Sequence, residues 1–265
     1  MKNVGFIGCG KMASAIISGI VKAGLFKKEN IRASETVKEF AENRHVQLGI
    51  DVFCDNRKLA KISDVIFIAT KPNQVEGVLQ EISNEIDDKK LIVSIAAGVK
   101  LEKIENICVN IPVIRVMPNA PLMVKMGMSA IVKGKFAKDS DVEFVRQILE
   151  SLGRCIVISE DKIDIVTAIS GSGPAFIYKI IHEMALAGEN LGMKYDDALL
   201  LAEQTAMGSA NLMMQSDLTP VELIKNISTK GGCTEVGVSI MNDRNTRQLF
   251  EDVIKETTLK AHSLG

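Results

Sequence analysis

A glycine turn near the start of the chain constrains the fold more than any other feature. Val4–Ile7 is an apolar run that predicts a short buried strand, and the sequence GCGKMA follows it at residues 8–13. The spacing G-x-G-x-x-A is the dinucleotide-binding fingerprint, with Ala13 in the place of the third glycine. Gly8 permits the tight turn, and Gly10 leaves room for the backbone to approach a pyrophosphate. The N-terminus of the helix that follows then favours phosphate through its free N–H groups and its dipole.

An acidic residue stands where such a fold recognises the adenine ribose. The second predicted strand, residues 30–34, ends at Glu35, close to the expected distance of roughly 20 residues beyond the glycines. A carboxylate accepts hydrogen bonds from both ribose hydroxyls but repels a 2′-phosphate. We therefore expect NADH or dual use of NADH and NADPH, with a slight preference for the former. If NADPH is used instead, Ser34 or Lys38 must take its phosphate.

Composition excludes several other classes of protein. The 265 residues suffice for two domains, and 46% apolar with 25% charged residues is typical of a soluble globular protein. A formal net charge of −1 gives no field that favours nucleic acid or an anionic membrane, and tryptophan is absent. No apolar run approaches the ~18 residues of a spanning helix, and the N-terminal run is too short for a signal peptide. We expect a cytoplasmic protein without nucleic-acid or membrane partners.

Cysteine and histidine give no support to a disulfide framework or a metal site. The five cysteines are widely spaced and contain no C-x-x-C pair, and the three histidines form no H-E-x-x-H pattern. The sequence predicts buried free thiols, a reducing compartment and no bound metal.

Strand-like and helix-like segments alternate up to about Glu160. Residues 64–70 and 91–97 are continuous apolar runs of the kind found in a sheet covered on both faces. Weaker strands are predicted at residues 50–53, 113–117, 129–132 and 155–159, with helices at residues 37–43, 75–86, 101–106 and 141–152. This alternation predicts a Rossmann-type, doubly wound, mostly parallel α/β sheet over residues 1–160. Functional groups in such sheets lie at the carboxyl ends of the strands, which here places Lys71 beside the dinucleotide.

Beyond residue 160 no further strand is predicted, and helical patterns fill residues 161–265. Helices are expected at 161–169, from Pro174 to about 191, at 195–215, at 220–227 and in two closing segments, with a break at residues 170–173. An all-helical half this apolar, without a sheet of its own, is expected to complete its core with a second subunit. We therefore divide the chain into a dinucleotide-binding domain, 1–160, and an all-helical substrate-binding and dimerisation domain, 161–265.

A second glycine-rich segment, TKGGCT at residues 229–234, opens one of the closing helices. Backbone N–H groups at that helix start could hold a carboxylate, and the hydroxyls of Thr229 and Thr234 add donors. An ordinary helix–helix turn capped by threonine explains the same residues equally well. The SGSG segment at residues 170–173 is neither a G-x-S-x-G elbow nor a P-loop, and no histidine stands nearby for a serine hydrolase.

Along its whole length the chain resembles the pyrroline-5-carboxylate reductases, the last enzymes of proline synthesis. The shared landmarks are GFIGCGKMA at residues 5–13, ATKP at 69–72, VSIAAGV at 93–99, RVMPN at 115–119, SGSGPA at 170–175 and GGCT at 231–234. The resemblance implies hydride transfer from NADPH or NADH to a cyclic imine. It also implies a homodimer with helices exchanged between subunits, assembling further to a decamer.

The resemblance also assigns roles to matching positions. It implies cofactor contacts along the glycine turn (Ile7, Gly8, Cys9, Gly10, Lys11, Met12), at Ser34, Glu35 and Asn56, and at Ala69, Thr70, Lys71, Pro72, Ile95, Ala96 and Ala97. Substrate contacts are implied at Glu160, Asn226, Thr229, Gly232, Cys233 and Thr234. The Thr234 hydroxyl would hold the ring nitrogen as the catalytic residue, and the helix start would hold the carboxylate. Many relatives carry serine or arginine where this chain has Glu35, which leaves the choice of cofactor open.

Two other functions remain open from the sequence. One is a two-domain reductase of hydroxy acids or of another imine, although none of the lysines of the helical half stands in a pattern typical of such enzymes. The other is a dinucleotide sensor without turnover, which leaves residues 231–234 unexplained.

Overall fold

The structure is a computed structural model that describes residues 2–264, and it contains two compact units. Of the described residues, 2–172 and 257–264 form the sheet unit, and 173–256 form the helical unit. The boundary between the two compact units therefore lies after Ser172, later than the boundary predicted at Glu160 from the sequence pattern. The last turns of the final helix, from Thr257, belong to the sheet unit.

The sheet unit is built on one eight-stranded sheet with the order β3-β2-β1-β4-β5-β6-β7-β8. Its strands are β1 (Val4–Ile7), β2 (Ile31–Ser34), β3 (Asp51–Phe53), β4 (Val65–Ile68), β5 (Leu91–Ser94), β6 (Val113–Met117), β7 (Gly127–Lys133) and β8 (Gly153–Ile158). All neighbouring pairs are parallel except β6 and β7, which are antiparallel. This confirms the predicted mostly parallel, doubly wound sheet.

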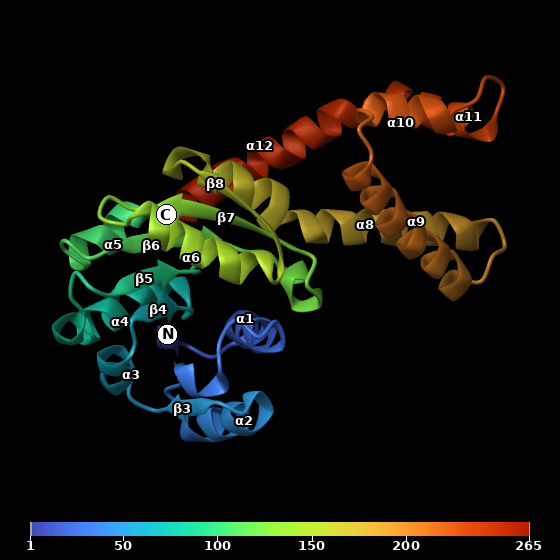
Figure 1. Ribbon diagram of the computed structural model, residues 1–265. Helices are drawn as coiled ribbons and strands as arrows, with labels where there is room; N and C mark the ends of the chain where they lie inside the picture. Colours follow the sequence, from blue (N-terminus) through green and yellow to red (C-terminus); the bar gives the residue numbers. More distant parts are fainter. Residues whose placement is uncertain (1, 265) are drawn as a thin grey trace. The chain divides into compact units, whose positions relative to one another are not determined.

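Helices cover both faces of this sheet (Figure 1). They are α1 (Lys11–Lys22), α2 (Lys38–Leu48), α3 (Asn56–Ile62), α4 (Val75–Glu81), α5 (Leu101–Ile107), α6 (Asp139–Glu150) and α7 (Ile163–Val166). Side chains of α1 and α6 pack on one face, and those of α3, α4 and α5 on the other. Because both faces are covered, the strands β1, β4 and β5 are buried along their whole length.

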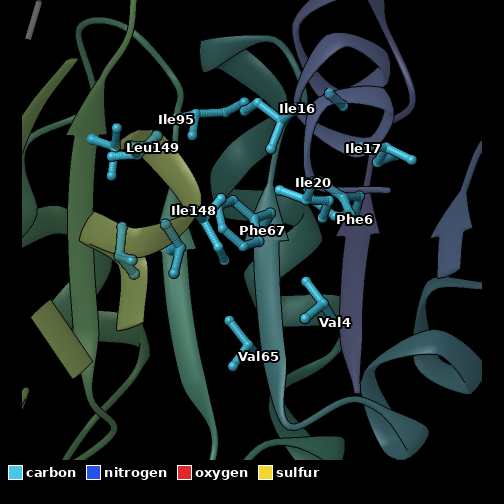
Figure 2. Close-up of a cluster of buried hydrophobic side chains, with 14 of the residues drawn as sticks. Val4, Phe6, Ile16, Ile17, Ile20, Val65, Phe67, Ile95, Ile148 and Leu149 are labelled. Carbon is cyan, nitrogen blue, oxygen red and sulfur yellow. The ribbon is translucent and has the colours of Figure 1, made fainter. Parts of the chain in front are cut away.

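The core on the α1 face is closely packed (Figure 2). Phe6 of β1 and Phe67 of β4 stack with ring centroids 4.6 Å apart. On α1, a side chain at Gly19 would place its Cβ 1.9 Å from a methyl carbon of Leu152. The absence of a side chain at Gly19 therefore lets α1 lie against the start of β8, which fixes the helix that carries the glycine turn.

The sequence missed one helix and shortened another. The segment of α3 was not predicted as a helix: only Asn56, Leu59 and Ala60 are buried, and the other residues are three exposed cationic side chains and the exposed Ile62. The helix predicted at residues 37–43 continues to Leu48 and ends at Gly49, whose φ of +65° is left-handed.

The helical unit contains α8 (Gly173–Asn190), α9 (Tyr195–Gln215), α10 (Pro220–Ile227), α11 (Cys233–Asp243) and the start of α12 (Thr246–Leu264). Close contact between α8 and α9 depends on small residues, since a Cβ at Gly188 would lie 3.0 Å from that of Ala198. The start of α10 is a capping box: the Thr219 side chain accepts from the Glu222 N–H, and the Glu222 carboxylate accepts from the Thr219 N–H. Within residues 2–264, no helix combines the length and apolarity that crossing a bilayer requires.

Two sequence predictions are wrong in detail. The break expected at residues 170–173 is a π-helix, η6 (Thr167–Gly171), which leaves only Ser172 between it and α8. All five cysteines are free, but only Cys9 and Cys108 are buried, whereas Cys54 and Cys233 are exposed. Cys54 follows a short edge strand, and Cys233 stands at a helix start on the surface of the chain; neither position could be recognised as exposed from residue type alone.

Candidate active site

The glycine turn has the geometry that its spacing predicts. Gly8 has a φ of +88°, and a Cβ there would lie 2.8 Å from the carbonyl oxygen of Ala69 at the end of β4. Gly8 is therefore required both by its backbone conformation and by its neighbour. Around Gly10, by contrast, a Cβ would meet nothing within 4 Å, and Gly10 supplies no side-chain cap to α1. The start of α1 is thus open to a ligand.

Side chains hold the peptide groups of Cys9 from both sides. The Cys9 N–H donates to Oε2 of Glu35 over 3.2 Å. The Cys9 carbonyl accepts from Nε of Arg44 over 2.9 Å and from the Ser14 hydroxyl over 3.3 Å. Burial raises the pKa of the Cys9 thiol, so this cysteine is a packed side chain of the turn and remains protonated at neutral pH.

A cavity of about 480 Å³ opens beside the turn at the carboxyl ends of β1, β2 and β4. It is lined by Ile7, Gly8, Gly10, Ser34, Glu35, Thr36, Asn56, Ala69, Thr70, Lys71, Gln74, Gly77, Val78 and Glu81. The hydroxyl of Thr70 is buried in this wall and has no hydrogen-bond partner among residues 2–264. A buried hydroxyl without a partner at the edge of a cavity is available to a bound ligand.

A chain of hydrogen bonds crosses the cavity wall. The buried Ser34 hydroxyl donates to Oδ1 of Asn56 over 2.7 Å, and Nδ2 of Asn56 donates to Oε2 of Glu81 over 2.8 Å. Glu81 was not singled out in the sequence: it is the last residue of α4, and it belongs to no motif. With Glu35 it gives the cavity two carboxylates, and Lys71 is the one cation among the described residues that line it.

Nine of the sixteen residues predicted to bind cofactor line this one cavity: Ile7, Gly8, Gly10, Ser34, Glu35, Asn56, Ala69, Thr70 and Lys71. Of the others, Cys9 lies behind the turn, and Lys11 lines a different cavity along α1. Ile95 and Ala96 are buried after β5, while Ala97 is exposed at the same edge of the sheet. Met12 is half-buried in the first turn of α1, and Pro72 is exposed at the start of a 3₁₀ turn.

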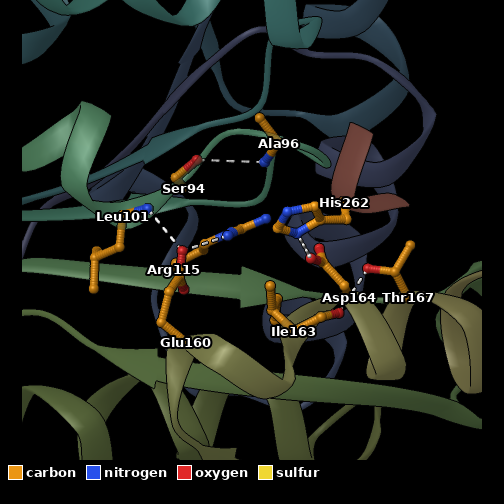
Figure 3. Close-up of polar contacts among 9 residues, drawn as sticks. All are labelled: Ser94, Ala96, Leu101, Arg115, Glu160, Ile163, Asp164, Thr167 and His262. Carbon is orange, nitrogen blue, oxygen red and sulfur yellow. Dashed lines mark hydrogen bonds and ion pairs between the residues drawn. The ribbon is translucent and has the colours of Figure 1, made fainter. Parts of the chain in front are cut away.

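The residues predicted to bind substrate fall in two separate parts of the chain. Glu160 belongs to the sheet unit, where its Oε1 contacts Nη1 of Arg115 at 2.5 Å and accepts from the Leu101 N–H over 2.9 Å (Figure 3). Arg115 is only 3% exposed, so this carboxylate neutralises a buried guanidinium. Figure 3 also shows Asp164 beside His262, with their Oδ2 and Nδ1 atoms 3.0 Å apart. These pairings could not be predicted from the sequence, because the partners are far apart in the chain.

The other predicted substrate residues belong to the helical unit. Gly232 is the N-cap of α11, and its N–H donates to the Thr229 carbonyl over 2.9 Å. Gly231 has a φ of +76°, and its N–H donates to Oε2 of Glu235 over 2.7 Å. One of the turn's donors is therefore already used by a carboxylate. The side chains of Asn226, Thr229, Cys233 and Thr234 are exposed on the chain.

The cavity at the glycine turn fits a dinucleotide on two structural grounds. The space around Gly10 and the uncapped start of α1 can take a pyrophosphate, and the Thr70 hydroxyl lacks a partner. Glu35 stands at the end of β2, where a ribose is bound in folds of this strand order.

Comparison with known proteins assigns both halves of the chain. Residues 160–264 match the family described as pyrroline-5-carboxylate reductase dimerisation, and residues 3–98 match the family described as NADP oxidoreductase, coenzyme F420-dependent. The chain is 36% identical to a pyrroline-5-carboxylate reductase of Methanosarcina acetivorans, covering 100% of this chain and 98% of that protein.

Solved structures give the same result. The chain resembles a pyrroline-5-carboxylate reductase of Coxiella burnetii with a TM-score of 0.95 and 30% identity, covering 100% of this chain and 98% of the other. A pyrroline carboxylate reductase of Plasmodium falciparum with NADP bound is similar over the same shares of each chain, with a TM-score of 0.88 and 30% identity.

Proposed function

Because the chain belongs to the pyrroline-5-carboxylate reductase family, we propose how its own residues carry out the family's reaction. The enzyme reduces 1-pyrroline-5-carboxylate to proline by hydride transfer from a nicotinamide cofactor, the last step of proline biosynthesis. The observation that carries this conclusion is the match to reductases of this name along the whole chain.

Cofactor binding is assigned to the cavity at the glycine turn. The start of α1 beyond Gly10 would hold the pyrophosphate, and the Thr70 hydroxyl would gain the partner it lacks in the protein. Ile95, Ala96 and Ala97, at the end of β5, would continue the site along the carboxyl edge of the sheet. The bound nicotinamide supplies the hydride that converts the C=N bond of the substrate into a C–N bond.

The negative charge within this cavity favours NADH over NADPH. We propose that the enzyme prefers NADH or uses both cofactors. Glu35 already accepts one backbone N–H through Oε2 and another, from Thr36, through Oε1 over 3.2 Å. Its remaining lone pairs can accept the ribose hydroxyls. A 2′-phosphate there would meet two carboxylates, Glu35 and Glu81, against the single cation Lys71.

The substrate is assigned to the start of α11. Its carboxylate would bind the free N–H groups of that helix start and the Thr229 hydroxyl, and the Thr234 hydroxyl would hold the ring nitrogen. The imine nitrogen takes its proton from water before or during reduction, so a site without histidine suffices. The negative charge of Glu235, held by the Gly231 N–H, would favour the cationic iminium form of the substrate over the neutral imine.

The helical half matches a dimerisation family, which supports assembly of the chain into an oligomer. We propose that residues 161–265 form the dimerisation and substrate-binding half, that the unit in solution is a homodimer, and that dimers assemble further to a decamer.

The direct test follows absorbance at the reduced-nicotinamide band with purified protein and pyrroline-5-carboxylate, with NADH and NADPH in parallel. We expect oxidation of both cofactors, with a higher kcat/KM for NADH. The absence of oxidation, from folded protein that still binds either cofactor, would remove the proposed reaction. A higher kcat/KM for NADPH would leave the reaction standing and overturn the assignment of Glu35.

A further inference from the structure

A second cavity, of about 320 Å³, runs along the exposed side of α1, behind the glycine turn. Its walls come from α1, from α2 and from η4 (Ala120–Val124) with the residue that follows. The residues that matter here are Lys11, Ser18, Lys22, Arg44, Gln47 and Lys125. All of them belong to the sheet unit, so the cavity is complete within one compact part of the chain.

Positive charge is concentrated in this cavity without compensation. Its described lining contains four cationic side chains and no carboxylate. None of the four forms an ion pair within residues 2–264. Arg44 is fixed by neutral acceptors, because Nε donates to the Cys9 carbonyl over 2.9 Å and Nη1 to Oε1 of Gln47 over 2.5 Å. Four like charges around one cavity repel one another, and a bound anion would relieve this repulsion.

The spacing of these residues indicates the length of the anion. Lys11, Ser18 and Lys22 stand on one face of α1, and the two lysines are separated by about 16 Å along the helix at 1.5 Å per residue. A single phosphate cannot contact both ends of such a row. A linear polyphosphate can contact a lysine at one end while its middle accepts from the Ser18 hydroxyl and from the guanidinium of Arg44.

This cavity is distinct from the one assigned to the cofactor. The peptide groups of Cys9 separate the two: the N–H bonds Glu35, which lines the cofactor cavity, and the carbonyl bonds Arg44, which lines the basic cavity. Among the described lining residues, the cofactor cavity has two carboxylates and the basic cavity has none. We propose that the cavity along α1 binds a small linear polyphosphate, free or as the tail of a nucleotide, at the same time as the dinucleotide is bound.

The test titrates the full-length protein with inorganic triphosphate by calorimetry in the presence of saturating NADH. We expect one triphosphate per chain, with an affinity that falls as salt is raised. The double variant Lys22→Gln/Lys125→Gln should weaken this binding by about 10-fold or more, since two charge-assisted contacts are removed. The matched control, Lys61→Gln/Lys89→Gln, removes two exposed lysines of the same unit that do not line the cavity, and it should bind as the parent does. Equal thermal unfolding of both variants shows that they are folded.

Three outcomes would overturn the proposal. Triphosphate binding that disappears when NADH is saturating would locate the anion in the cofactor cavity. Binding displaced by NADPH but not by NADH would make the basic cavity a 2′-phosphate subsite. Binding that is equally strong in the double variant, or absent altogether, would show that these lysines hold no anion. Adenosine triphosphate serves as a second probe in the same titration: affinity equal to that of inorganic triphosphate supports recognition of the polyphosphate alone, whereas tighter binding of the nucleotide supports recognition of the polyphosphate as a nucleotide's tail.

Discussion

At the scale of single residues, two cavities of opposite charge lie on either side of Cys9 in the glycine turn. Glu35 and Glu81 make the cofactor cavity acidic, and Arg44 contributes to a basic cavity on the other side of Cys9. The sequence predicts Glu35 from its distance to the glycines. It cannot predict Glu81, because only the folded structure places this carboxylate next to Asn56 of α3, which in turn accepts from Ser34 of β2.

We expect the cofactor preference to depend on Glu35. In a Glu35→Ser variant the repulsion of a 2′-phosphate is reduced and only Glu81 still opposes it, so kcat/KM for NADPH should rise by about 10-fold relative to that for NADH, in line with the loss of one unfavourable contact between charges. Parallel kinetics with both cofactors measure the ratio. The control Glu39→Ser removes an exposed carboxylate of α2 that does not line the cavity. A ratio that stays constant in Glu35→Ser would assign cofactor selection to other residues.

Thr234 tests the proposed substrate site. Loss of its hydroxyl in Thr234→Ala should lower kcat/KM for pyrroline-5-carboxylate by about 10- to 1,000-fold, the range for one positioned polar group. The affinity for NADH, measured by fluorescence titration, should remain as in the parent, because the cofactor cavity belongs to the sheet unit. Unchanged kinetics in the folded variant would exclude a catalytic role for this hydroxyl.

The ion pair of Arg115 and Glu160 makes an asymmetric prediction for stability. Glu160→Ala leaves a guanidinium that is 3% exposed without its counter-charge, and we expect a loss of about 2–3 kcal/mol in the free energy of unfolding. Arg115→Met removes the buried charge itself and leaves a carboxylate that is one-third exposed, so it should cost less. Urea unfolding at equal protein concentration compares the two variants. A larger loss of unfolding free energy in Arg115→Met than in Glu160→Ala would contradict this, and would show that the packing of the arginine side chain matters more than the neutralisation of its charge.

At the scale of elements, the strands were predictable and several connections were not. The runs at β4 and β5 are continuously apolar because both faces of the sheet are covered, and this signal needs no tertiary information. The short helix α3 buries only three of its residues, and so it carries little periodicity. The π-helix η6 has the composition of a turn, and its Ser170 carbonyl accepts a hydrogen bond from Asn119, a residue far away in the chain. Likewise, the glycines of the cofactor site could be predicted because their role depends on local backbone geometry. The residues that complete the cavity wall could not, because they come together only through the order of the strands in the sheet.

One of these distant contacts can be tested at Asn119. After β6, its Nδ2 donates to the Ser170 carbonyl of η6 over 3.1 Å, and its Oδ1 accepts from the Met128 N–H of β7 over 2.8 Å. Asn119→Ala removes both bonds from a buried position and should lower the free energy of unfolding by about 2 kcal/mol. Chemical denaturation measures this, with the exposed Asn84→Ala as the control. An equal effect of the two substitutions would show that η6 does not depend on Asn119.

At the scale of the whole molecule, the helical unit exposes far more apolar surface than a free protein keeps in water. Of the residues on its helices α8 to α11, only Ala185, Ala198 and Ala202 are buried. Large apolar side chains exposed on the same helices include Ile177, Tyr178, Leu200, Leu201, Met207, Leu212, Met213, Ile224, Ile227, Val236 and Ile240. Such a surface is typical of an interface, and the match to a dimerisation family agrees with it.

This surface predicts both the assembly and its sensitivity to charge. Light scattering should give a mass of at least two chains at micromolar concentration, with ten chains if the dimers assemble to the proposed decamer. Leu212→Glu introduces a charge into the apolar face of α9 and should dissociate the assembly, because an unpaired charge cannot be buried at an interface. Val46→Glu, on the exposed face of α2 in the sheet unit, is the matched control and should leave the mass unchanged. A parent protein with the mass of one chain would refute the interface. A Leu212→Glu variant that keeps the full mass would place the interface on other helices of the unit.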